Sequence, residues 1–193
     1  MRQIVLASKS PRRKRLLENI GLKFTIIPSN INEDLIPIAS PKEYAETLSK
    51  KKTQKVAQKH KDAIIIGADS IVIFKNEIIG KPSSFKNAKE ILRKLSGQRH
   101  MVITGYTVLD SKTNNSITNS VTSYVVFKDL TDNEINAYVK TREPMGKAGA
   151  YAIQEKAGRF IEKVEGDFFN VVGLPIFALC QELEKFGINI TES

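Results

Sequence analysis

The sequence predicts an α/β fold built on a mixed β-sheet. Helical patterns alternate with β-branched runs along the 193 residues. Some neighbouring runs are joined by short polar turns typical of hairpins, whereas others are joined by helices that act as crossovers. Hairpins connect antiparallel strands and crossovers connect parallel ones, so an all-parallel sheet is not expected.

Capping residues mark where the expected helices begin. Ser10 and Pro11 begin the first helix, which Gly21 ends. Capping boxes at residues 40–43 and 131–134 begin two more, and the former helix should run to about His60. The remaining two helices are indicated by apolar residues at helical spacing, namely Ala88, Ile91, Leu92 and Leu95 before a stop at Gly97, and Leu179, Cys180, Leu183 and Phe186 after Pro175.

The β-branched runs predict the strands, and the segments between them predict a hairpin. Strands are expected at residues 3–7, 63–68, 70–74, 77–79, 100–109, 117–127, 148–154 and 159–165. The polar stretch 110–115 fits a hairpin turn better than a domain linker. Without repeats or a Gly/Ser linker, residues 1–193 are expected to form a single domain, or two small lobes around a cleft.

Composition narrows the class of protein. Hydrophobic residues make up 41% and charged residues 26% of the chain, as in soluble globular proteins. No apolar run approaches the roughly 18 residues that span a bilayer, and the start turns basic too early for a signal peptide, so a cytoplasmic location is expected. Cys180 is the single cysteine, which excludes an intramolecular disulfide and favours oxygen ligands for any metal. The net charge of +9 favours a polyanionic partner, whether nucleic acid, nucleotide or an anionic membrane surface.

Basic residues gather at the predicted start of the first helix. The segment Ser8–Arg13 lies where a strand meets a helix, and the free N–H groups and the helix dipole there attract a phosphate. Arg12 and Arg13 are unfavourable for that dipole unless an anionic ligand completes the site. The alternative is an ordinary capped helix with solvated arginines, and spacing alone does not choose between them.

Two further charged residues stand in apolar surroundings. Asp69 interrupts a continuous buried strand pattern, which is typical of a carboxylate that binds a cation or transfers a proton, although a solvent-facing aspartate at a strand end would fit too. Lys52 lies in the apolar row of its helix, where it could point into a site or, as periodicity alone favours, reach the solvent from the edge. Lys81 at a rigid turn and Glu33 in a polar loop are weaker candidates.

One histidine and the absence of several known motifs limit the possible kinds of enzyme. His100, at the start of a strand, is expected to be a structural hydrogen-bonding residue rather than a base. The fingerprints of P-loop proteins, dinucleotide enzymes, serine hydrolases and zinc proteases do not occur in the sequence.

Six segments together resemble one known family. They are Leu6–Arg13 (LASKSPRR), Gly67–Ser70 (GADS), Gly80–Pro82 (GKP), Leu95–His100 (LSGQRH), Lys147–Gln154 (KAGAYAIQ) and Asn170–Pro175 (NVVGLP). In order and spacing they resemble the Maf family of nucleoside triphosphate pyrophosphatases, from about residue 4 to 186. The resemblance implies a fold related to inosine triphosphate pyrophosphatases, an elongated mixed sheet with helices around a nucleotide cleft, often as a homodimer.

The resemblance also implies an activity and a set of site residues. The reaction would be hydrolysis of a nucleoside triphosphate to its monophosphate and diphosphate, with Mg²⁺ or Mn²⁺ as cofactor and neither nucleic acid nor membrane as a stable partner. Family motifs assign Ser8, Arg12 and Arg13 to phosphate binding, Glu33 and Asp69 to the metal and to catalysis, Lys52 and Lys81 to catalysis, and Ser70 and Gln154 to the base. A regulatory inhibitor of cell division, or a nucleic-acid-binding protein, remains the alternative.

The preferred nucleotide follows from the same segments. Ser-Pro-Arg-Arg, Ala-Gly-Ala-Tyr and Ile-Gln resemble the branch that acts on dTTP and UTP rather than on 7-methyl-GTP. Ser70 stands where threonine is common in that branch, and Glu155 stands where glycine is common. The expected substrates are therefore dTTP and UTP.

Overall fold

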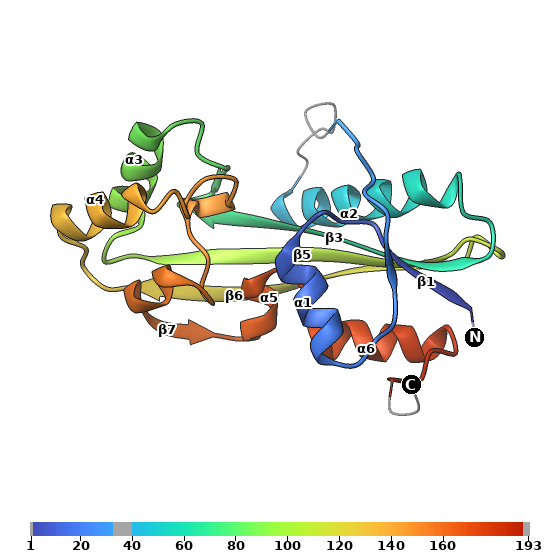
Figure 1. The fold of residues 1–193 in the computed structure, drawn as a ribbon. Coiled ribbons are helices and arrows are strands. Elements are labelled where there is room, and N and C mark those ends of the chain that lie inside the picture. The colour runs from blue at the N-terminus through green and yellow to red at the C-terminus, as the bar shows by residue number, and fades with distance from the viewer. Residues whose placement is uncertain (1, 33–39, 191–193) are drawn as a thin grey trace. The chain divides into compact units, whose positions relative to one another are not determined.

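The structure is a computed structural model that describes residues 2–32 and 40–190 (Figure 1). Its strands are β1 (Gln3–Leu6), β2 (Thr25–Ile26), β3 (Ala63–Phe74), β4 (Glu77–Ile79), β5 (Arg99–Asp110), β6 (Ser116–Phe127) and β7 (Ile161–Glu165). Its helices are α1 (Pro11–Asn19), α2 (Pro41–Ala57), α3 (Phe85–Leu95), α4 (Asp132–Lys140), α5 (Phe168–Val172) and α6 (Ile176–Lys185), with short 3₁₀ helices η2 (Ala148–Ala150) and η3 (Lys156–Phe160).

The strands form a mixed sheet, which confirms the predicted fold class. The strand order is β2-β1-β3-β5-β6-β7, with β4 paired to β3. β1 is parallel to both β2 and β3, whereas β3–β4 and β6–β7 are antiparallel. In the part of the chain that is described, no helix combines the length and apolar composition needed to span a membrane.

The chain divides into two compact units. The first unit comprises Met1–Asp69, Thr104–Val121 and Gly173–Ser193, and the second comprises Ser70–Ile103 and Thr122–Val172. β3 passes from the first unit to the second between Asp69 and Ser70.

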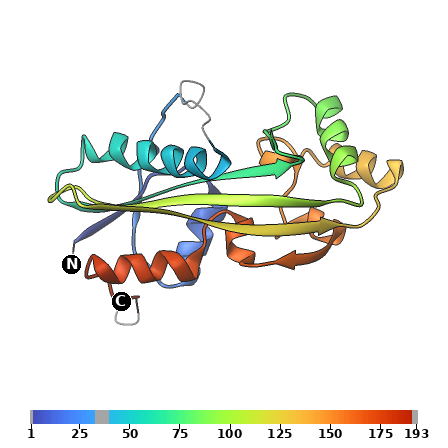
Figure 2. The ribbon, with the colours of Figure 1, turned by 180° about the vertical axis from the view of Figure 1, so that it is seen from behind.

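In the first unit, helices cover both faces of the sheet. α2 lies on one face, and α1 and α6 lie on the opposite face, as the front and back views both show (Figures 1 and 2). One cluster of its core is formed by Val5, Ala7, Val56, Ala63, Ile65 and Leu109. At the end of β5 the backbone N–H of Asp110 donates to the carbonyl of Asn115, 2.9 Å away, which confirms the hairpin predicted at 110–115.

In the second unit, α3 packs against α4 (Figure 2). Its core is rich in aromatic rings. The buried rings of His100 and Phe127 meet edge to face at 5.0 Å between centroids, and those of Tyr138 and Phe160 meet in the same way at 5.1 Å. Edge-to-face pairs of this kind add stability beyond their buried area.

Several predicted element boundaries are wrong. Residues 148–154 do not form a strand, because Gly149 and Ala150 adopt positive φ values of 69° and 61° and close the turn η2. The strand expected at 159–165 begins at Ile161, after η3, and α2 ends at Ala57 rather than near residue 60. The two runs beside Asp69 are one strand, β3. The short elements β2 and α5 were not predicted. Cys180, one of the apolar residues that predicted the last helix, is only partly buried.

Candidate active site

The turn between β1 and α1 is built around two serine hydroxyls. Ser8 follows the fully buried end of β1 and is itself only 8% exposed. Its Oγ accepts hydrogen bonds from the backbone N–H of Ser10 (3.1 Å) and from Nη1 of Arg13 (3.3 Å). Ser10 is the N-cap of α1, and its Oγ accepts from the backbone N–H of Arg13 at 3.5 Å. The predicted helix start is thus confirmed.

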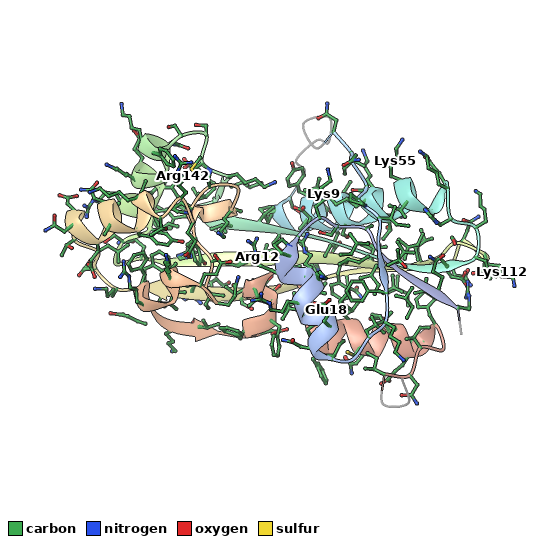
Figure 3. The ribbon with its side chains drawn as sticks, in the orientation of Figure 1. Lys9, Arg12, Glu18, Lys55, Lys112 and Arg142 are labelled. Carbon is green, nitrogen blue, oxygen red and sulfur yellow. The ribbon has the colours of Figure 1, made fainter. Side chains whose placement is uncertain are left out.

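This helix start is strongly positive. Arg12 and Arg13 occupy the first turn of α1, and that turn, which lies wholly within the described residues, holds no acidic side chain. Figure 3 shows Arg12 on this turn, whereas Glu18 lies towards the other end of the helix. Two guanidinium groups added to the positive end of a helix dipole make a strong site for a phosphate.

Arg13 is held in place by a backbone group that the sequence did not single out. Its Nε donates to the carbonyl oxygen of Gly173 at 2.8 Å. Gly173 has a φ of 127°, which a residue with a side chain adopts only with strain. The segment Asn170–Pro175 was recognised only as a family motif, and nothing in its composition indicates that a carbonyl there would orient an arginine.

Lys52, which is buried, and Asp69, which is partly buried, form an ion pair. Lys52 is 8% exposed as a residue, and Nζ of Lys52 donates to Oδ1 of Asp69. The side chains of Lys52 and Asp69 are 11% and 14% exposed. Asp69 does not face the solvent, and Lys52 does not reach it from the edge of its helix. Both of these alternative interpretations of the sequence are therefore wrong. Lys55, one turn further along α2, points away from the sheet instead (Figure 3).

A glycine brings α2 close enough to form this pair. A Cβ on Gly67 would lie 2.7 Å from Cγ2 of Thr53 and 2.8 Å from the carbonyl oxygen of Ser49. Because Gly67 has no side chain, α2 packs directly on β3, and Lys52, next to Thr53, reaches Asp69 two residues beyond Gly67. Gly105 on β5 likewise allows the start of α2 to pack closely on the sheet, because a Cβ added there would lie 2.3 Å from the carbonyl of Ala45.

Strand register places the turn between β1 and α1 beside β3, the strand that carries Asp69. In the parallel pair β1–β3, Leu6 lies opposite Ile66, and the backbone N–H of Ala7 donates to the carbonyl of Ile66 at 2.8 Å. The turn that starts at Ser8 therefore leaves β1 alongside the stretch of β3 that carries Asp69. The carboxyl end of parallel strands is where α/β proteins generally bind ligands.

The donor set of this unit fits one kind of metal. The described residues contain no group of three His, Cys, Asp or Glu side chains that could hold an ion by themselves, and Glu33 lies outside them. Mg²⁺ is typically held by one or two carboxylates together with waters and substrate phosphates. Asp69 beside the arginine-bearing start of α1 fits that arrangement and does not fit a zinc cage.

The remaining predicted residues belong to the second unit. Ser70 is half-buried on β3, whereas Lys81 and Gln154 are exposed. The backbone N–H of Gly149 donates to the carbonyl of Gly80 at 3.2 Å, so the Lys81 turn and the segment that begins at Lys147 lie together. His100 is buried, its Nε2 lies 2.8 Å from the hydroxyl of Tyr151, and burial lowers its pKa to about 4. Its structural role is as predicted.

Comparison with known proteins shows the family to which the chain belongs. A family model described as Maf-like protein matches residues 3–186. A dTTP/UTP pyrophosphatase from Alkaliphilus metalliredigens is 49% identical over 98% of this chain and 100% of its own length. Proteins with the same name from Methanosarcina barkeri and Bacillus cereus are 46% and 43% identical, each over 100% of this chain and over 98% and 100% of their own lengths.

A solved structure shows the same fold in a distant protein. The Staphylococcus aureus Ham1 protein superposes with a TM-score of 0.53 at 16% identity, covering 95% of this chain and 98% of that one. At this identity the likeness concerns the fold alone. The mixed sheet with helices on its faces is therefore an arrangement that very different sequences adopt.

Proposed function

Because the chain belongs to the Maf-like protein family, we propose that it is an enzyme that hydrolyses dTTP and UTP to the nucleoside monophosphate and diphosphate. The observation that carries this proposal is the largely buried ion pair between Lys52 on α2 and Asp69 on β3, beside an arginine-bearing helix start. Relatives that match the whole chain are named dTTP/UTP pyrophosphatases, which supports the choice of nucleotide.

The first unit would bind the triphosphate through Ser8, Arg12 and Arg13. A nucleoside triphosphate carries about four negative charges, so cleavage at the α-phosphate requires cations around the departing diphosphate. The N–H groups at the start of α1 and the two guanidinium groups supply positive charge there. Arg13, tied to Ser8 and Gly173, also keeps this turn in one conformation before substrate arrives.

Asp69 would take the proton from the attacking water. Lys52 keeps a positive charge beside this carboxylate and fixes one of its oxygens, which leaves the other oriented for the water. By the family motifs, Lys81 would contact the phosphates, and Ser70 and Gln154 would contact the base.

We further propose that the reaction needs Mg²⁺ or Mn²⁺, held by Asp69 and, from the family motif, Glu33. Bound there, the ion would neutralise phosphate charge and lower the pKa of a water. The protein would act in the cytoplasm as a homodimer of a single domain spanning residues 1–193. Sedimentation of the purified chain at several concentrations tests the dimer.

One assay tests the reaction class and the metal together. The chain is incubated with dTTP, UTP, CTP, ATP and 7-methyl-GTP, each with Mg²⁺, with Mn²⁺ or with a chelator, and the products are separated. We expect dTMP or UMP and diphosphate from dTTP and UTP, and no turnover with the chelator. Nucleoside diphosphate and orthophosphate as first products would refute the proposal, and full turnover with the chelator would refute the metal.

A further inference from the structure

Gln154 lies in a tight turn formed by residues 152–155. Ala152 and Ile153 are buried, whereas Gln154 itself is exposed. The N–H of Glu155 donates to the carbonyl of Ala152 at 3.1 Å, and a Cβ on Gly158 would lie 2.8 Å from the carbonyl oxygen of Ile153. The backbone of this loop is therefore held on both sides of the exposed glutamine.

The side chain and the backbone of Glu143 also hold the segment around Gln154 in place. Its Oε1 accepts from the hydroxyl of the buried Tyr138 at 2.9 Å, and its Oε2 accepts from the N–H of Lys156 at 3.3 Å. Its backbone carbonyl accepts from Nζ of Lys147 at 2.5 Å. A single residue thus anchors both the start of η3 and the side chain of Lys147.

Lys147 in turn holds the carboxylate of Glu155, which binds Gln154. The Lys147 side chain is only 13% exposed, and its Nζ lies 3.1 Å from Oε2 of Glu155. The other oxygen of that carboxylate, Oε1, accepts a hydrogen bond from Nε2 of Gln154 at 3.2 Å. Glu155 is thus held between a nearly buried cation and the amide of Gln154.

This arrangement fixes the amide of Gln154 in one of its two orientations. An ionised carboxylate only accepts hydrogen bonds, so the NH₂ half of the amide must face Glu155. Turning the amide by 180° would place its carbonyl oxygen against the carboxylate, two acceptors facing each other. The carbonyl oxygen and the second N–H of Gln154 are therefore presented in a fixed order.

We propose that Glu155, held by Lys147, is a positioning residue that makes Gln154 select thymine and uracil over cytosine. The inference rests on the proposed function, in which Gln154 contacts the base. Thymine and uracil offer a carbonyl at position 4 and an N–H at position 3, whereas cytosine offers an amino group and a bare nitrogen at the same places. An amide free to flip satisfies either pattern, but an amide held in one orientation satisfies only one of them.

The specificity test uses Glu155→Gln, which keeps the size of the side chain. The new amide can donate to Gln154 as well as accept from it, so both orientations of Gln154 become available. We expect the ratio of kcat/KM for dTTP to that for dCTP to fall on the order of tenfold, the scale of one mispaired hydrogen bond. The matched control is Glu162→Gln, which removes the same charge from an exposed position on β7 and should leave the ratio unchanged.

A double mutant shows whether Glu155 acts through Gln154. Gln154→Ala should abolish the preference, and adding Glu155→Gln to it should change the ratio no further. An unchanged ratio in Glu155→Gln alone, with dTTP still hydrolysed, would overturn the proposal. So would an additive effect in the double mutant, because Glu155 would then act independently of Gln154.

A measurement without nucleotide separates the amide orientation from the proposed function. The side-chain NH₂ signals of Gln154, assigned by their loss in Gln154→Ala, should shift in Glu155→Gln and should stay in place in the control Glu162→Gln. Signals of Gln154 that are the same in the wild-type protein and in Glu155→Gln would overturn the fixed orientation, whether or not dTTP is hydrolysed. If the wild-type protein hydrolyses neither dTTP nor UTP, the proposed function fails and the selectivity fails with it, while these signals still decide the orientation.

Discussion

At the scale of single residues, the ammonium of Lys52 and the carboxylate of Asp69 lie together with little solvent around either. Removing charged groups from water is costly, and the pair recovers that cost only while both members are present. Apolar residues of similar size in the same position would often make the protein at least as stable. A role in catalysis, beside a turn suited to phosphate, therefore explains this charged pair better than a role in stability does.

Replacing Lys52 should therefore damage activity. We expect Lys52→Ala to fold, as judged by circular dichroism, and to lose about 10²-fold in turnover of dTTP, the scale of one electrostatic group at a reacting phosphate. The control is Lys51→Ala, since Lys51 is exposed on the same helix and should leave turnover unchanged. A loss of stability in Lys52→Ala with full activity in the folded fraction would mean that the lysine is only structural.

His100 gives a residue-scale prediction about pH. Its pKa is lowered from 6.5 to about 4, chiefly by burial. The unfolded chain therefore binds a proton more readily than the folded chain, so the stability that neutral His100 provides is complete above about pH 6.5 and is lost as the pH falls towards 4.

Urea unfolding at two pH values tests this prediction. We expect the free energy of unfolding to fall between pH 7.5 and pH 5, with about 2 kcal/mol of the loss due to His100. In His100→Gln that share of the loss should disappear. An equal pH dependence in the variant and the wild-type protein would show that other groups cause it.

At the scale of elements, the distance between α2 and β3 decides where Lys52 lies. Gly67→Ala would bring a methyl group to 2.7 Å from Thr53 and 2.8 Å from the backbone of Ser49, so the helix must move away. We expect a destabilisation of about 1–3 kcal/mol and, because Lys52 moves with the helix, a loss of turnover in the protein that remains folded. Unfolding curves and turnover per folded molecule measure the two effects.

Gly80→Ala is the matched control for stability. Nothing lies within 4 Å of a Cβ built on Gly80, so this substitution should change the free energy of unfolding by much less than Gly67→Ala. If Gly67→Ala were as stable and as active as the wild-type protein, close packing at Gly67 would not be what positions Lys52.

The elements themselves were predictable where local signals agree. Ser10, Ser40, Ser84 and Thr131 all cap helices, and the first, second and fourth of these were evident from the sequence. The turn at residues 148–150 was not, because positive φ at Ala150 is enforced by its surroundings and its apolar neighbours are typical of a strand. β2, of two residues, is too short to leave a periodic pattern.

At the scale of the whole molecule, the site residues were predictable by type but not by contact. The arginines at the start of α1 and Asp69 in β3 stand out in the sequence because each opposes a local preference. The pairing of Lys52 with Asp69 and of Arg13 with Gly173 depends on close packing between segments far apart in the chain. Periodicity describes one element at a time, so it favoured the wrong environment for Lys52.

Attack on the α-phosphate by water held by Asp69 can be tested by the fate of the water oxygen. The protein hydrolyses dTTP in water enriched in oxygen-18, and mass spectrometry locates the label in the products. We predict that the label enters dTMP and not diphosphate, and that Asp69→Asn gives the same products with turnover lower by roughly 10² to 10⁴. Label in the diphosphate would show that the water attacks another phosphate, and near-normal turnover in a folded Asp69→Asn protein would show that Asp69 does not activate the water.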